Sequence, residues 1–134
     1  MGQQQLLLII LGVIVVGIAV VVGISMFQDN AISANRDAVT NDLVNLGARA
    51  QQFYRRPVSL GGGGNNFATL TMDKLAGPIG GGSWTNPNGT YSIDGSPTAT
   101  SVDLKGIGTE KSGGNFVEVH CHITADSLTT TVTN

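Results

Sequence analysis

An uninterrupted apolar stretch near the N-terminus constrains this chain more than any other feature. From Leu6 to Ile24 all 19 residues are aliphatic or glycine, and no charged side chain occurs before Asp29. At 1.5 Å per residue, a helix of this length crosses most of a bilayer hydrocarbon core, which is about 30 Å thick. The stretch is too long for the hydrophobic region of a typical signal peptide. We therefore expect a helix that needs lipid or other protein copies around it.

The helical pattern continues beyond the apolar stretch, because no proline occurs before Pro57. Apolar residues recur at spacings of 7, 4, 3, 4 and 3, which is the pattern of one helical face: Ile32, Val39, Leu43, Leu46, Ala50 and Phe53. Polar residues fall mostly on the other faces: Asn30, Asn35, Arg36, Asp42, Asn45, Arg49 and Gln52. We predict one helix from about residue 3 to about residue 55, apolar all round in its first half and amphipathic in its second.

The rest of the chain has the pattern of a small antiparallel meander. Turn signals recur between short segments rich in Val, Ile, Thr and Tyr, at Asn86–Gly89, Asp94–Pro97 and Lys111–Gly114. The glycine run Gly61–Gly64 predicts a flexible loop. The segment Phe67–Ala76 fits a short helix and a strand equally well.

Three strands are expected after residue 99, over Thr100–Gly108, Phe116–Thr124 and Leu128–Thr133. In the first of them, alternation makes Val102, Leu104 and Ile107 the candidate inward residues. So small a sheet buries too little apolar surface to be stable alone. We therefore expect it to pack on the amphipathic part of the helix.

The predicted fold class is α+β, with one long N-terminal α-helix packed on a small antiparallel β-sheet. The chain divides into three parts. Residues 1–28 form a hydrophobic half-helix suited to a membrane or a filament core, residues 29–56 an amphipathic half-helix, and residues 57–134 a small β-rich globular head. The amphipathic half-helix and the head are expected to form a single domain.

Composition argues against several classes of function. With seven basic and nine acidic residues and a net charge of −2, the chain has no basic field for nucleic acid. The single cysteine, Cys121, excludes an intrachain disulfide and a metal cage made of cysteines. No phosphate-loop motif is present, and two histidines close together give no catalytic triad. We expect no enzyme activity and no cofactor.

The sequence His120-Cys121-His122 invites a metal-site interpretation. On a strand, the two histidines point to one face and Cys121 to the other. Zn²⁺ requires a third and a fourth ligand, of which Asp103 or Glu118 is positioned to supply one. We expect no metal, keep His120 and His122 as weak candidates, and expect Cys121 to be a buried thiol.

The tripeptide Asn88-Gly89-Thr90 matches the acceptor sequence for N-linked glycosylation on a predicted exposed turn. Asn-Gly is also an ordinary hairpin turn, which needs no sugar. Both interpretations of Asn88 stay open at this stage.

Taken together, the uncharged N-terminus, the apolar stretch, the amphipathic continuation, the glycine-rich loop and the small sheet resemble a type IV pilin. The resemblance covers the architecture of the whole chain, and its specific part is residues 1–56. In the family the first mature residue is usually N-methylated and the fifth is typically Glu; here these are Met1 and Gln5. If the leader peptidase cuts after Gly2, the first residue is Gln3 and the fifth is Leu7. Bacterial and archaeal sources both stay open.

The resemblance implies a structural subunit of an extracellular type IV pilus-like filament, which serves attachment or motility at the cell surface. Such subunits lie in the inner membrane until a leader peptidase and an assembly machinery deliver them to a helical homopolymer. The implied partners are therefore copies of the same chain, the inner membrane and that machinery. The implied assembly residues are Met1, Gln5, Leu6, Leu7, Leu8, Ile9, Ile10, Leu11, Gly12, Ile14, Gly17, Ile18, Val21, Gly23 and Phe27.

Small residues in the apolar stretch, at Gly12, Gly17, Ala19 and Gly23, permit close approach of helices. Glycine within a β-branched run also lowers helix propensity, which predicts local unwinding near residues 15–24 in a filament. Two other functions fit the same pattern. One is a minor pseudopilin of a secretion system, and the other is a bitopic membrane protein with a small extracytoplasmic binding domain.

Overall fold

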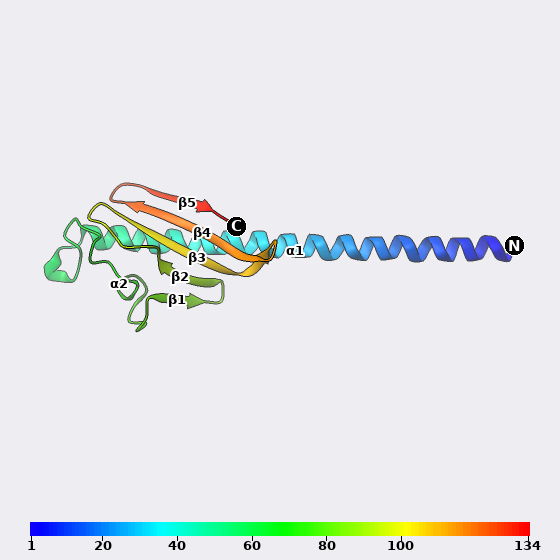
Figure 1. The fold of residues 1–134 in the computed structure, drawn as a ribbon, viewed down its shortest axis with the longest axis horizontal. Coiled ribbons are helices and arrows are strands. Elements are labelled where there is room, and N and C mark those ends of the chain that lie inside the picture. Colours follow the sequence, from blue (N-terminus) through cyan, green and yellow to red (C-terminus); the bar gives the residue numbers. More distant parts are fainter.

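A computed structural model describes all 134 residues (Figure 1). Helix α1 runs unbroken from Gly2 to Arg55, which at 1.5 Å per residue makes it about 80 Å long. Its second half lies along a β-sheet, whereas its first half extends away from the rest of the molecule (Figure 1). The predicted long helix and the predicted α+β class are therefore confirmed.

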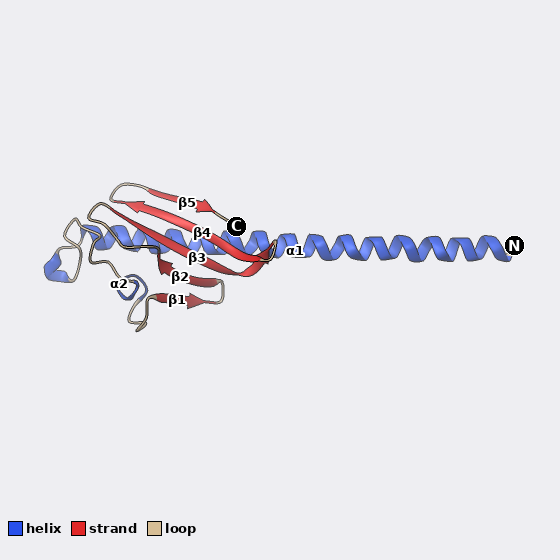
Figure 2. Ribbon diagram, viewed as in Figure 1, coloured by secondary structure: helices blue, strands red, loops and turns tan.

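The head adds a short 3-10 helix, Val58–Leu60, the short helix α2 and five strands (Figure 2). Each strand pairs antiparallel with the next along the chain, so the sheet order is β1-β2-β3-β4-β5 and the predicted meander is confirmed. Half of the ambiguous segment Phe67–Ala76 is helical. The elements are α2 (Met72–Ala76), β1 (Ser83–Asn86), β2 (Gly89–Ile93), β3 (Ser101–Ser112), β4 (Asn115–Thr124) and β5 (Leu128–Val132).

The core lies between α1 and the sheet. The predicted stripe on α1 is buried at five of its six positions, and the sixth, Ile32, is partly buried against the same cluster. Burial of each large aliphatic side chain stabilises the fold by about 1.5–3 kcal/mol. The amphipathic half of α1 and the head therefore share one core, whose residues are Val39, Leu43, Leu46, Ala50, Phe53, Phe67, Leu70, Met72, Leu75, Tyr91, Val102, Leu104, Val117, Val119, Cys121 and Ile123.

The prediction that Ile107 points inward is wrong. Val102 and Leu104 are buried as expected, but the next inward positions on β3 are Gly106 and Gly108, and Ile107 is only half-buried. The reason is the close approach of α1. A Cβ on Gly106 would lie 2.7 Å from Cγ1 of Val39, closer than carbon atoms pack. Glycine is therefore required on the face where the pattern of large apolar residues suggested isoleucine.

Asn35 also departs from expectation, because it lies on the buried face of α1 with 9% of its surface exposed. Its Oδ1 accepts hydrogen bonds from the backbone N–H groups of Thr109 (3.1 Å) and Glu110 (3.3 Å), and its Nδ2 donates to the carbonyl oxygen of Asn88 (2.9 Å). The pairing of β3 with β4 shifts register between Ile107 and Lys111. Asn35 thus satisfies backbone groups that this irregularity leaves without a strand partner.

The glycine run after α1 is a loop, but backbone hydrogen bonds hold it in place. The N–H of Gly63 donates to the carbonyl of Phe53 (2.9 Å), and the N–H of Asn65 donates to that of Tyr54 (2.7 Å). These carbonyls belong to the last turn of α1, where the helix itself provides no donors. The loop therefore caps α1 rather than acting only as a flexible connection.

Candidate assembly surface and polar clusters of the head

The first half of α1 is the largest unpartnered surface of the chain. Every residue from Met1 to Asn30 is exposed, and the most apolar part of the helix has none of its residues buried. All of the predicted assembly residues lie here, with Met1 just before the helix and the others between Gln5 and Phe27. By length and composition, α1 is able to cross a membrane.

Exposure of this kind is costly in water. Leucine, isoleucine and valine side chains in the segment are more than half exposed, from 52% at Val22 to 67% at Leu8. Each such side chain gains about 1.5–3 kcal/mol on burial, and contiguous apolar patches of this size mark contacts with protein or membrane. The segment therefore requires an apolar partner that the chain itself does not supply.

Three glycines in this half-helix have no role in packing within the chain. A Cβ added at Gly12, Gly17 or Gly23 would meet no atom within 4 Å, whereas one at Gly47 would overlap the side chain of Leu128. Gly12 and Gly23 are about three turns apart and share one side of α1. Because neither carries a side chain, another helix is able to pack closely against that side. The helix is continuous through residues 15–24, and the unwinding expected in a filament stays a prediction.

A polar cluster joins α1 to the hairpin of β1 and β2. Oδ2 of Asp42 accepts hydrogen bonds from the hydroxyl of Tyr91 (2.6 Å) and from the side-chain amides of Asn86 (2.8 Å) and Asn88 (3.0 Å). Burial by itself would raise the pKa of Asp42, but these three donors outweigh it and the pKa is lowered. Burial and the Asp42 carboxylate raise the pKa of Tyr91. The cluster fixes the hairpin on the helix.

Asn88 lies in the predicted turn but is half-buried rather than exposed. Its side-chain nitrogen, the atom that would carry an N-linked sugar, donates to Asp42. Its backbone N–H donates to Oδ1 of Asn86 (2.9 Å), as in a tight turn. The hairpin interpretation is therefore confirmed, and glycosylation of Asn88 remains a prediction.

The two histidines lie on the outer face of β4, and Cys121 between them is buried. Nε2 of His120 lies 2.7 Å from Glu118, and Nδ1 of His122 lies 2.5 Å from Asp103. The hydrogen bond with His120, aided by Lys105 at 3.4 Å, lowers the pKa of Glu118. No group of three or more His, Cys, Asp or Glu side chains in the structure is arranged to hold a metal ion. Nδ1 of His120 also lies 3.2 Å from Asp94, so His120 contacts two carboxylates and His122 contacts one.

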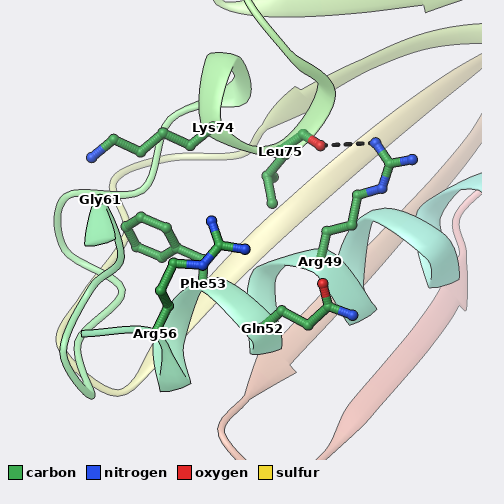
Figure 3. Close-up of a pocket in the computed structure, with 7 residues that line it drawn as sticks. All are labelled: Arg49, Gln52, Phe53, Arg56, Gly61, Lys74 and Leu75. Carbon is green, nitrogen blue, oxygen red and sulfur yellow. Dashed lines mark hydrogen bonds between the residues drawn. The ribbon is translucent and has the colours of Figure 1, made fainter. Parts of the chain in front are cut away.

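A basic pocket of about 320 Å³ opens where α1 meets the loop after it (Figure 3). Arg49, Arg56 and Lys74 contribute three positive charges, and Phe53 lies between them (Figure 3). Nη1 of Arg49 donates to the carbonyl of Leu75 (3.0 Å), and the Lys74 ammonium lies 5.0 Å from the centre of the Phe53 ring. None of the three cations forms an ion pair within the chain; the contacts between basic and acidic side chains involve Arg55, Lys105, His120 and His122.

Comparison with family models, with curated proteins and with solved structures finds no match for this chain. The sequence patterns located the exposed half-helix and the histidine pair. They did not reveal the Asp42 cluster or the basic pocket, because each brings together residues from elements far apart along the chain. No local spacing signals such a cluster.

Proposed function

We propose that this protein is the structural subunit of an extracellular type IV pilus-like filament, used for attachment or motility. Polymerisation proceeds through the apolar half of α1, which forms the filament core. The head, with its sheet and loops, faces outward as the surface of the filament. The subunit acts by assembly rather than by catalysis and uses no cofactor.

One observation carries this proposal. A fully exposed apolar half-helix continues without a break into a half that is packed firmly on the head. Helices that bundle side by side bury such a surface without any change in the head. Since lipid and a protein core are both apolar, the half-helix is able to leave one for the other at little hydrophobic cost.

The proposal also specifies where the subunit lies and what it meets. Before assembly the apolar half-helix spans the inner membrane, with the head outside the cytoplasm. A leader peptidase and an assembly machinery then act on the N-terminal segment and deliver it to the growing filament. After assembly, the main partners are other copies of the same chain.

Deletion of Leu6–Ile24 tests the proposal. We expect a chain without this segment to leave the membrane fraction as a folded head and to form no filaments. Substitution of Val13 by leucine serves as the matched control, because it lies in the same segment, keeps it apolar and should leave filaments intact. Filaments formed by the deleted chain would overturn the proposal.

A bitopic membrane protein with an extracytoplasmic binding domain is the second candidate, because a helix able to cross a membrane is also satisfied by lipid alone. The two candidates differ in what shearing releases from cells. A filament subunit is found in the sheared material, whereas a bitopic protein stays in the membrane fraction.

A further inference from the structure

We propose that subunits stack end to end along the filament through opposite charges, with Asp29 of one copy facing the basic pocket of another copy. The occupant of the pocket is thus a carboxylate of the same protein. This inference rests on the proposed function and adds to it a specific contact and a specific stagger between copies.

The charges on α1 divide into those used within the chain and those left free. Arg36 bonds to Asn134 and Ser112, Asp42 to the hairpin, and Arg55 lies near Asp126. By contrast, the exposed carboxylates of Asp29 and Asp37 form no hydrogen bond or ion pair, and the cations of the basic pocket meet no acid. The free acids therefore lie in the middle of α1, whereas the free bases gather around its C-terminal end.

Asp29 and Arg49 lie on opposite flanks of α1, because they are 20 residues apart in the sequence, which is about five and a half turns. Arg56 directly follows α1 and lines the same pocket as Arg49. A contact between opposite flanks of identical chains is heterologous, and such a contact repeats into an open helical polymer rather than closing a dimer.

The stagger that pairs these charges is similar to the length of α1 that packs on the sheet. Moving one copy along the helix axis by 20 to 27 residues places its Arg49 or Arg56 level with Asp29 of the other, a shift of about 30–40 Å. The head contacts α1 from Ile32 to Phe53, a length of about 32 Å at 1.5 Å per residue. At a stagger of 27 residues, the stretches from Ile32 to Phe53 of two copies do not overlap. The apolar halves of these two copies barely overlap, so other copies bundle with each of them.

Hydrogen bonds within the chain already hold two of the basic side chains of the pocket in place. The Arg49 side chain is held by its hydrogen bond to Leu75, and Lys74 Nζ donates to the carbonyl of Thr69 (3.0 Å). Arg56 lines the same pocket as these two cations and Phe53 (Figure 3). Arginine presents a fork of donors that matches a carboxylate. The pocket has three positively charged side chains and no acidic residue among those that line it. Such a pocket favours an acidic partner over a neutral one.

A charge exchange in the full-length protein tests the contact in sheared filaments. We expect Arg56→Glu alone and Asp29→Arg alone each to lower the filament yield by about tenfold or more, because like charges then face each other. The double variant restores the opposite charges and should restore the yield. Arg55→Glu is the matched control: Arg55 is exposed, its neighbour Asp126 belongs to the same chain, and exposed pairs of this kind contribute little.

Cross-linking gives a second and independent readout. Cysteines replacing Asp29 and Arg56 in one chain lie about 40 Å apart along α1, so a short bismaleimide joins them only between chains. The native Cys121 is buried and does not react with the cross-linker. We expect a ladder of multimers from filaments of the double-cysteine chain, and no ladder from either single-cysteine chain.

The outcomes separate this inference from the proposed function. If the unaltered chain forms no filaments, the proposed function fails and the inference fails with it. If filaments form but Arg56→Glu and Asp29→Arg leave the yield unchanged, or the double variant stays defective and no ladder appears, the filament stands and the stacking contact is overturned.

Discussion

The side chain of Asn35 occupies the space that a Cβ on Gly108 would need, so the two residues depend on each other. Here the side chain of Asn35 on α1 packs directly against the backbone of β3. Asn35 also holds the backbone of the irregular end of β3 through two accepted hydrogen bonds. The crossing thus combines a tight approach with complete pairing of polar groups.

Replacement of Gly108 by alanine should destabilise the head. The added methyl group overlaps Oδ1 of Asn35. This oxygen is then displaced and loses its hydrogen bonds from the backbone N–H groups of β3. Overpacking of this kind costs about 1–3 kcal/mol. Urea unfolding of the full chain in detergent, followed by the fluorescence of Trp84, measures the change. Gly82→Ala, where a Cβ meets nothing within 4 Å, is the control, and equal midpoints for the two variants would contradict the prediction.

The Asp42 cluster should make the stability of the head depend on acid. The pKa of Asp42 in the folded chain lies below its ordinary value of 3.8, so the unfolded chain binds its proton first as the pH falls. The stabilisation is therefore present above about pH 4 and is lost as the pH falls through the lower, folded-state pKa. Asp42→Asn should unfold more easily than the unaltered chain at neutral pH and differ less from it at about pH 3.

The matched control for that experiment is Asp37→Asn, because Asp37 is exposed and has no hydrogen-bond partner in the chain. Urea midpoints at the two pH values supply the comparison. If the difference between Asp42→Asn and the unaltered chain grows on acidification, the ionised Asp42 is not what stabilises the hairpin.

Cys121 should resist thiol reagents as long as the head is folded. The residue is fully buried, and burial, with a smaller effect of Asp103, raises the pKa of its thiol to about 11. The thiolate, which is the reactive form, is therefore scarce at about pH 8. Maleimide labelling followed by mass spectrometry should show no adduct in the folded chain and one adduct in urea. Rapid labelling without urea would show that the sheet opens.

How far the sequence predicts the fold differs between the helix and the sheet. The stripe from Val39 to Phe53 was predicted correctly, because helical spacing depends only on neighbours along the chain. The prediction for Ile107 is wrong, because the alternating pattern depends on large apolar side chains and Gly106, which faces the core, carries no side chain. Whether glycine faces the core depends on how closely α1 approaches, which no local pattern records.

The polar sites illustrate the same limit. Asn35 resembles any other surface asparagine in the sequence, and only the shifted register of β3, 74 residues later, gives it buried partners. Asp42 and Tyr91 are separated by 49 residues. By contrast, the opposite faces of His120 and Cys121 were predicted correctly, because the two are adjacent on one strand and side chains alternate there.

Gly12 allows assembly and folding to be tested separately. A larger side chain at this position meets nothing within the chain, so Gly12→Leu should leave urea unfolding of the head unchanged. In a filament core it would hold neighbouring helices apart, and we expect filament yield to fall by about tenfold. Val13→Leu, an exchange of one exposed aliphatic for another, should assemble normally. Equal yields for the two variants would mean that no helix packs against Gly12.

The filament proposal is tested by shearing the cell surface, isolating the filaments that are released, and measuring the intact mass and N-terminal sequence of their subunit. We expect this chain to be the main subunit, with a mature N-terminus at Met1 or Gln3. Recovery of the chain only in the membrane fraction, with none in the sheared filaments, would contradict it.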